Sequence, residues 1–176
     1  SVERAGNYLL SLINNILDIT RIESKKLDII EEKFSLRQLV QEVCLIGAKQ
    51  AEAKNLEFVV DVEETLPKYL EGDALHIKQV ILNLINNAVK YTKKGKVFLE
   101  VCQEEKQISF SVKDTGIGIK KEDMEALFDM FMRADIKRHR NIEGSGLGLT
   151  IAKELCEQMG GHIQAESIYG KGSNFT

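Results

Sequence analysis

The chain has 176 residues, of which 43% are hydrophobic, and a formal net charge of -3. This length allows one or two domains with a sizeable core, and the mild acidity gives no reason to expect nucleic-acid binding. The apolar runs are too short to span a bilayer and the amphipathic start carries charge throughout, so we predict neither a transmembrane segment nor a signal peptide.

The chain opens with a heptad pattern that predicts a long helix. Two apolar series recur every seven residues and form one stripe: Val2, Leu9 and Ile16, and Ala5, Leu12 and Ile19. A lone helix with such a stripe needs a partner. The alternatives are packing onto the rest of its own chain and packing as one arm of a helical bundle, and we favour a bundle between chains. We place a domain boundary within 25–34 and divide the chain into 1–27 and 28–176.

Helices and strands alternate after the boundary. Ser35, followed by Gln38, predicts a helix N-terminus with a capping box, and Asp73 predicts a second N-cap. A short strand or linker is predicted over 27–33, helices over 36–54, 74–91, 121–128 and 147–159, and strands over 56–62, 96–102, 107–113, 161–167 and from about 173. This mixture predicts an α+β fold, a two-layer sandwich in which helices cover one face of a mixed sheet.

The helix predicted over 74–91 carries a polar pair. Asn83 and Asn87 are four residues apart and therefore share one face. Mg²⁺ takes oxygen ligands and usually shares them with substrate phosphates, so an asparagine carbonyl oxygen suits it. Two solvated asparagines are the simpler interpretation of the pair alone. Lys90 and Tyr91, one turn later, add a cation and an aromatic ring near the same end and favour a nucleotide site.

A carboxylate precedes two glycines at the end of the strand predicted over 107–113. Asp114 is followed by Gly116 and Gly118, and glycine lets a ligand approach the backbone closely. A partly buried carboxylate accepts a hydrogen bond from an exocyclic amine, which favours adenine over guanine. An ordinary turn is the alternative interpretation of this sequence.

A glycine-rich turn leads into the last predicted helix. Its residues are Gly144, Ser145, Gly146, Leu147, Gly148 and Leu149. Free backbone N–H groups and the helix dipole make such a turn an anion site, although the spacing matches neither a Walker loop nor a dinucleotide fingerprint. The basic segment before it, 130–144, predicts a lid that orders on a polyphosphate, and a mobile solvated loop is the alternative.

Taken in order, these motifs resemble the catalytic ATP-binding region of bacterial two-component sensor histidine kinases. The likeness covers about 34–176, and 9–27 resembles the second helix of the family's dimerisation and histidine-phosphotransfer hairpin. The matching segments are an asparagine box at 83–91, an Asp-x-Gly-x-Gly box at 114–118, a phenylalanine box at 128–131, the glycine-rich box at 144–149 and a terminal glycine motif at 170–175.

The resemblance implies a Bergerat-type ATP-binding fold, ATP and Mg²⁺ as cofactors, and transfer of the γ-phosphoryl group to a histidine for relay to a response-regulator receiver domain. It implies a homodimer through the hairpin, a cytoplasmic location, and membrane attachment only through upstream segments. By the same resemblance Asn87 ligates Mg²⁺, Lys90 and Tyr91 contact the nucleotide, and Asn83, Asn87 and Lys90 form the catalytic set. Asp114, Gly116 and Gly118 would then hold the adenine, and 144–149 would border the phosphates.

The resemblance also has departures and competitors. His76, His139 and His162 lack the sequence context of the family's phosphoacceptor histidine, so we expect the acceptor outside this chain, and we expect the chain to be a piece of a longer protein with a truncated last strand. Related ATPases place a glutamate one turn before the metal-binding asparagine to activate water. Here that residue is Asn83, which is no general base near neutral pH and favours phosphoryl transfer over hydrolysis. The other alternative is a degenerate ATP-binding or adaptor module, against which the presence of every box argues.

Overall fold

The computed structural model describes residues 6, 13, 20, 28–129 and 146–176. Gly6, Ile13 and Thr20 are helical. The rest of the predicted first helix, with its heptad stripe, and the predicted lid lie outside the described residues. The strands are β1 (Glu32–Ser35), β2 (Glu57–Val62), β3 (Tyr69–Gly72), β4 (Lys96–Glu104), β5 (Gln107–Asp114), β6 (Ala165–Ile168) and β7 (Gly172–Phe175), and the helices are α2 (Leu36–Glu52), α3 (Ala74–Tyr91), α4 (Lys121–Met124) and α5 (Gly148–Gln158).

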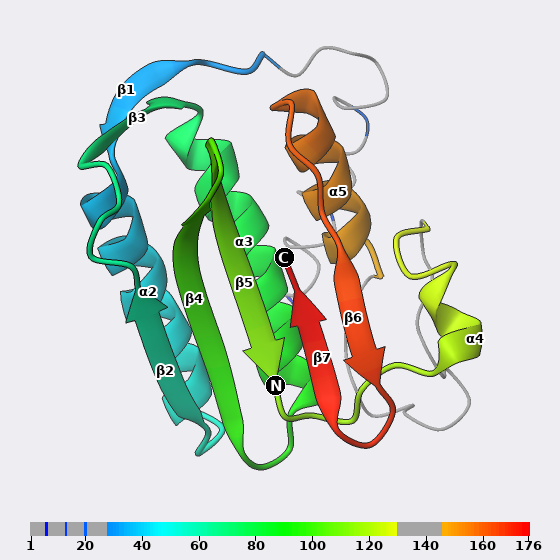
Figure 1. Cartoon of the computed structure of the whole chain (residues 1–176). Helices are drawn as coiled ribbons and strands as arrows, with labels where there is room; N and C mark the ends of the chain where they lie inside the picture. Colours follow the sequence, from blue (N-terminus) through cyan, green and yellow to red (C-terminus); the bar gives the residue numbers. More distant parts are fainter. Residues whose placement is uncertain (1–5, 7–12, 14–19, 21–27, 130–145) are drawn as a thin grey trace.

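Five strands form one mixed sheet in the order β2-β4-β5-β7-β6. β2 runs parallel to β4, whereas the other neighbouring strands are antiparallel. β1 and β3 form a separate antiparallel pair. Helices α2, α3 and α5 lie on one face of the five-stranded sheet (Figure 1). This arrangement confirms the predicted α+β sandwich with helices on one face.

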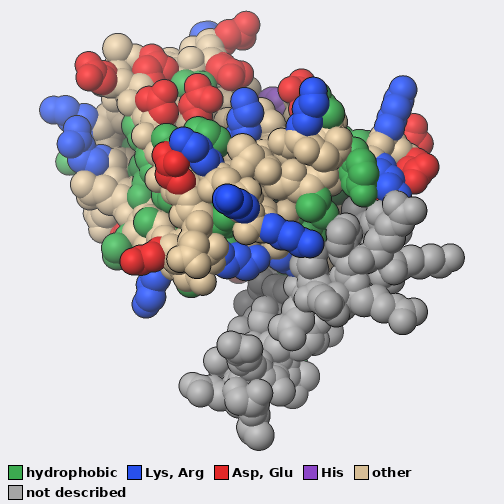
Figure 2. Space-filling view, turned by 90° about the horizontal axis from the view of Figure 1, so that it is seen from below, with side chains coloured by type: hydrophobic (Ala, Val, Ile, Leu, Met, Phe, Trp, Pro, Cys, Tyr) green, Lys and Arg blue, Asp and Glu red, His purple; other side chains and the backbone are tan. Residues whose placement is uncertain are grey.

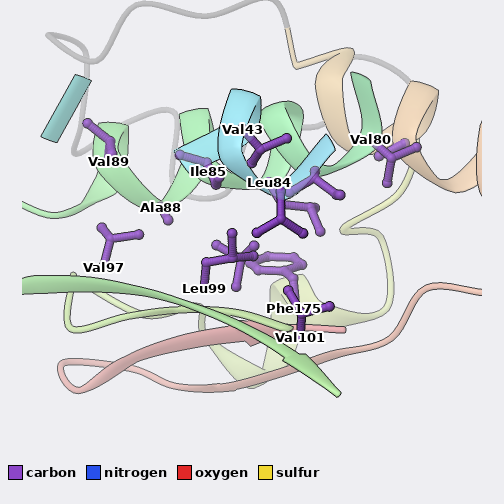
Figure 3. Packing of buried hydrophobic residues seen from close by; sticks show 14 of the residues in the cluster. Val43, Val80, Leu84, Ile85, Ala88, Val89, Val97, Leu99, Val101 and Phe175 are labelled. Carbon is purple, nitrogen blue, oxygen red and sulfur yellow. The ribbon is translucent and has the colours of Figure 1, made fainter. Parts of the chain in front are cut away.

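The core lies between the helices and the sheet. In β4, Val97, Leu99 and Val101 are at most 1% exposed, while Glu100 between them faces solvent. Their side chains point toward those of Leu84 and Ile85 on α3 and Phe175 on β7 (Figure 3). Burying a side chain of this size contributes about 1.5–3 kcal/mol. The central helix that carries the asparagine pair is therefore fixed firmly against the sheet.

Both predicted N-caps are confirmed. The Ser35 hydroxyl accepts a hydrogen bond from the Gln38 N–H at 3.3 Å, and Asp73 Oδ1 accepts one from the His76 N–H at 3.0 Å. No hydrogen bond from the Ser35 N–H to the Gln38 side-chain oxygen completes the predicted capping box, and the Gln38 Nε2 donates to Glu42 at 3.3 Å. Within the described part of the chain, no helix combines the length and apolar character needed to cross a bilayer.

Four element predictions need correction. The first strand covers 32–35 rather than 27–33, because its register is set by pairing Glu32 with Gly72. β3 was not predicted, since a four-residue strand that pairs with a distant segment leaves little local pattern. β6 begins at Ala165 rather than at 161, where its ladder with β7 starts opposite Phe175. α4 ends at Met124 rather than at 128, and turns follow it.

Asp73 joins the segment before β1 to the start of α3, and its removal should destabilise the fold. Its carboxylate is 5% exposed, accepts a second hydrogen bond from the Ile30 N–H at 3.0 Å and lies 2.6 Å from His76 Nδ1. We expect Asp73→Ala to lower the free energy of unfolding by about 1–2 kcal/mol at pH 7, as measured by urea denaturation. Ser35→Ala should lower the free energy of unfolding by less, because the hydrogen bond at that cap is longer, 3.3 Å, and exposed.

The loss caused by Asp73→Ala should depend on pH. Burial alone would raise the pKa of Asp73, but hydrogen bonds from His76 and Ile30 outweigh it and hold the pKa below its ordinary value. The stabilisation is therefore present above the ordinary pKa of the carboxyl and is lost as the pH falls through the lowered one. The difference between wild type and variant should shrink below about pH 4, and a constant difference down to acid pH would contradict this assignment.

Candidate nucleotide site

Helix α3 places the predicted asparagine pair beside the start of α5. Its buried face consists of Val80, Ile81, Leu84, Ile85, Ala88 and Val89, and Asn83 and Asn87 are half-buried beside that face. The Asn83 side-chain Nδ2 donates a hydrogen bond to the carbonyl oxygen of Gly148 at 3.3 Å. Two motifs that lie 65 residues apart in the sequence are thus in direct contact.

The last residue of β5, Asp114, supplies a buried acceptor. It is 5% exposed, and its Oδ1 accepts a hydrogen bond from the Gly116 N–H at 2.8 Å. Burial raises the pKa of the Asp114 carboxyl, while hydrogen bonds from the backbone N–H groups of Gly116 and Ser173 oppose that rise. A carboxylate that is shielded from water in this way forms strong hydrogen bonds with N–H donors. It suits the recognition of an exocyclic amine.

Glycines are required where the backbones around Asp114 approach each other. A Cβ on Gly116 would lie 2.5 Å from the Tyr91 carbonyl oxygen and 2.7 Å from Asp114 Oδ1. Gly172 has a positive φ of 123°, and a Cβ there would overlap the carbonyl oxygen of Asp114. The Asp-x-Gly-x-Gly box and the terminal glycine motif are therefore packed backbone against backbone.

Hydrogen bonds hold the loop after Asp114 between α3 and the β6–β7 hairpin. The Ile117 N–H donates to the Tyr91 carbonyl at 3.3 Å, and the Gly170 N–H donates to the Ile117 carbonyl at 2.7 Å. The Ser167 hydroxyl accepts from the Ile119 N–H at 2.7 Å and donates to the Gly172 carbonyl at 2.9 Å. Sequence reasoning missed Ser167, because a single serine in a short strand carries no local signal of such a role.

The last turn of α3 brings the predicted cation and ring together. Lys90 Nζ lies 4.6 Å from the centroid of the Tyr91 ring, within the range of a cation–π interaction. Both residues are half-buried. This end of the sheet is seen in Figure 2, where Lys and Arg side chains gather near the middle of the view. A polyphosphate would meet a favourable charge there.

The N-terminus of α5 keeps the features of an anion site. Gly146 has a positive φ of 75°, and Leu147 at the N-cap provides no side-chain hydrogen bond to the helix. The N-cap side chain therefore leaves the N–H groups of the first turn open to a bound anion as far as the described residues show. The Leu147 side chain is fully buried in the core, so this residue can face phosphates only through its backbone. Gly144 and Ser145 lie outside the described residues.

A further contact joins the predicted phenylalanine box to α5. The Thr150 hydroxyl donates to the Phe128 carbonyl at 3.0 Å, a contact that the sequence did not indicate. Among the described residues, no group of three or more His, Cys, Asp or Glu side chains is placed to hold a metal ion. Asn87, half-buried on α3, carries an amide oxygen of the kind that Mg²⁺ can take beside phosphate and water.

Comparison with known proteins gives a consistent result. Residues 72–176 match a family described as histidine kinase-, DNA gyrase B-, and HSP90-like ATPases. The chain is 42% identical over 180 residues to the sensor protein GacS of Pseudomonas syringae pv. syringae, covering 99% of this chain and 20% of GacS. It is 36% identical to the signal transduction histidine-protein kinase BarA of Escherichia coli K12, and the match covers 99% of this chain and 20% of BarA. The chain thus spans about a fifth of the length of these curated relatives.

Solved structures agree with the sequence relatives. Full-length ShkA in complex with AMPPNP matches with a TM-score of 0.86 and 29% identity, covering 98% of this chain and 35% of that one. The nucleotide-free catalytic domain of the histidine kinase ThkA matches with a TM-score of 0.69 and 27% identity, covering 83% of this chain and 92% of that domain.

Proposed function

The chain belongs to the histidine kinase-, DNA gyrase B- and HSP90-like ATPase family, and from that premise we propose that it is the ATP-binding catalytic region of a sensor histidine kinase. It would transfer the γ-phosphoryl group of ATP to a histidine outside this chain, for relay to an aspartate of a response-regulator receiver domain. The observation that carries the proposal is the buried Asp114 carboxylate, placed between the end of α3 and the terminal hairpin.

Each part of the nucleotide has a matching group. Asp114 would accept a hydrogen bond from the adenine amine, with Gly116 and Gly118 leaving room beside it. Lys90 and Tyr91 would contact the nucleotide from the end of α3. The first turn of α5, with the preceding glycine-rich turn, would bind phosphate oxygens through backbone N–H groups.

Phosphoryl transfer depends mainly on positioning and on charge stabilisation. Asn87 would supply an oxygen ligand to Mg²⁺, which neutralises phosphate charge when bound. Asn83 is neutral and already donates to the Gly148 carbonyl, so it would position the phosphate-binding turn and would not activate water. This argues for transfer over the hydrolysis typical of other members of the superfamily. A degenerate ATP-binding or adaptor module remains the alternative, and it would show no transfer.

Partners and location follow from the same proposal. We propose a homodimer formed through the helical hairpin to which 1–27 would belong, and a cytoplasmic position for the domain at 28–176. Membrane attachment, where it occurs, would come from segments upstream of the chain.

Asp114→Asn provides the direct test. Asparagine keeps the shape but loses the charge, and losing a hydrogen bond to a charged group costs about 1.5–3 kcal/mol. Calorimetry should therefore show Mg-ATP binding that is weakened about ten- to a hundredfold. Asp61→Asn, a charge change at an exposed position on β2, should leave the affinity unchanged. Equal affinity of the wild type for GTP and ATP would refute the assignment of Asp114 to adenine.

Stability measurements separate lost binding from lost folding in this variant. Because burial raises the pKa of Asp114, the folded state binds its proton more readily than the unfolded state does. Without nucleotide, the stability of wild type relative to Asp114→Asn should rise as the pH falls through the raised pKa. At neutral pH the variant should be no less stable than wild type.

A further inference from the structure

Lys54 contacts the end of the nucleotide-site helix from a distant segment. It lies in the turn between α2 and β2, at the same lower end of the view in Figure 1 as the last turn of α3. Its Nζ donates hydrogen bonds to the carbonyl oxygens of Val89 at 2.9 Å and Lys90 at 3.0 Å. A single side chain thus holds two backbone groups of the turn that carries Lys90 and Tyr91.

The last carbonyls of a helix have no partner within the helix, and in α3 those of Val89, Lys90 and Tyr91 find one outside the regular ladder. The regular ladder ends with the bond from the Thr92 N–H to the Ala88 carbonyl at 3.1 Å, and the Tyr91 carbonyl accepts from the Ile117 N–H at 3.3 Å. The carbonyls of Val89 and Lys90, which lie between these two, accept hydrogen bonds from Lys54 Nζ. Without Lys54, two of these three carbonyls would lose this partner.

The charge of Lys54 matters as well as its hydrogen bonds. The C-terminus of a helix carries a partial negative charge of roughly half an elementary charge, which repels phosphate and attracts a cation. Burial lowers the pKa of Lys54, and the positive charge of Lys90 lowers it further. A second ammonium group is thus held at the helix end despite that repulsion, while the ammonium of Lys90 lies over the Tyr91 ring.

We propose that Lys54 is a positioning residue of the nucleotide site. It fixes the last turn of α3 so that Lys90 and Tyr91 face the nucleotide, and its positive charge offsets the negative end of the helix beside the site. This inference rests on the proposed ATP-binding function. It assigns to the α2–β2 turn a role that none of the sequence motifs covers.

The test compares Lys54→Met with a matched control, Lys78→Met, in the whole 176-residue chain. Lys78 also joins α3 to α2, through a 2.9 Å ion pair with Glu42, but it lies more than three turns before the end of α3. Calorimetry should show that Lys54→Met binds Mg-AMPPNP about tenfold more weakly, as for lost hydrogen bonds to a charged group. Binding of adenosine should weaken less, because it carries no phosphate. Lys54→Arg, which keeps the charge and can donate to both carbonyls, should restore affinity to within about threefold.

The outcomes are distinct. The role of Lys54 would be wrong if Lys54→Met bound Mg-AMPPNP as tightly as the wild type does, or if Lys78→Met lost as much affinity as Lys54→Met. Either result would leave the proposed function standing. Equal losses for AMPPNP and adenosine would refute the electrostatic part of the proposal. Failure of the wild type to bind Mg-AMPPNP would remove the proposed function itself. Should circular dichroism show that Lys54→Met does not fold, Lys54→Gln carries the same comparison, since it removes the charge and keeps one amide donor.

Discussion

Replacing Gly172 with alanine should lower the free energy of unfolding by on the order of 3 kcal/mol or more. The residue is buried and has a φ of 123°, a region that side chains rarely adopt. The added Cβ would overlap the carbonyl oxygen of Asp114 and lie 2.9 Å from its carbonyl carbon. These are backbone atoms at the end of β5, so they cannot relieve the overlap by a change of side-chain rotamer. The terminal hairpin would separate from Asp114, and nucleotide binding would be lost with it.

Gly170→Ala is the matched control for this change. Gly170 lies in the same hairpin with a φ of 82°, but no heavy atom lies within 4 Å of a Cβ built there. Alanine at 170 should therefore cost only the left-handed strain of about 1–2 kcal/mol. Urea denaturation followed by circular dichroism measures both variants. If Gly172→Ala were no less stable than Gly170→Ala, the close approach of the hairpin to Asp114 would be wrong.

The parts of the fold that sequence predicted well are those specified by local chemistry. The caps at Ser35 and Asp73 follow from side chains that accept hydrogen bonds from N–H groups three residues ahead. The alternation of buried and exposed residues in β4 marks a strand with one face on the core. Such patterns are contained within a few residues and can be recognised without a partner.

The parts that sequence reasoning missed depend on distant partners. β3 exists because Tyr69–Gly72 pairs with a strand more than thirty residues earlier. Lys54 and Ser167 gain their roles only when the fold brings the α3 terminus and the loop after Asp114 beside them. Neither residue type is unusual at its position, so no local pattern distinguished them. The sequence motifs predict a set of groups for the site, whereas the contacts that hold those groups in place are seen only in the structure.

The second large effect is expected at Asn87. Asn87→Ala should abolish the Mg²⁺-dependent part of ATP binding and, in a longer protein that carries the acceptor histidine, phosphoryl transfer. Asn87 is half-buried on the face of α3 that it shares with Asn83, one turn before Lys90 and Tyr91. Asn83 already uses its amide nitrogen on the Gly148 carbonyl, so the two amides have different tasks. Removing a partner that only orients a metal ligand typically costs about 10–100-fold in metal affinity, and removing a ligand should cost at least as much.

Calorimetry with and without a chelator separates the two asparagines. Wild type should bind ATP more tightly with Mg²⁺ than with EDTA, and Asn87→Ala should bind equally weakly in both. Asn83→Ala should retain the Mg²⁺ dependence while binding less tightly, because it loses the contact that positions the first turn of α5.

The same pair of variants, Asn83→Ala and Asn87→Ala, decides between phosphoryl transfer and hydrolysis. Since a neutral amide is no general base near neutral pH, the chain should show little steady-state ATPase activity, and Asn83→Ala should change it little. Robust hydrolysis by the wild type that disappears in Asn83→Ala would overturn the assignment of both residues.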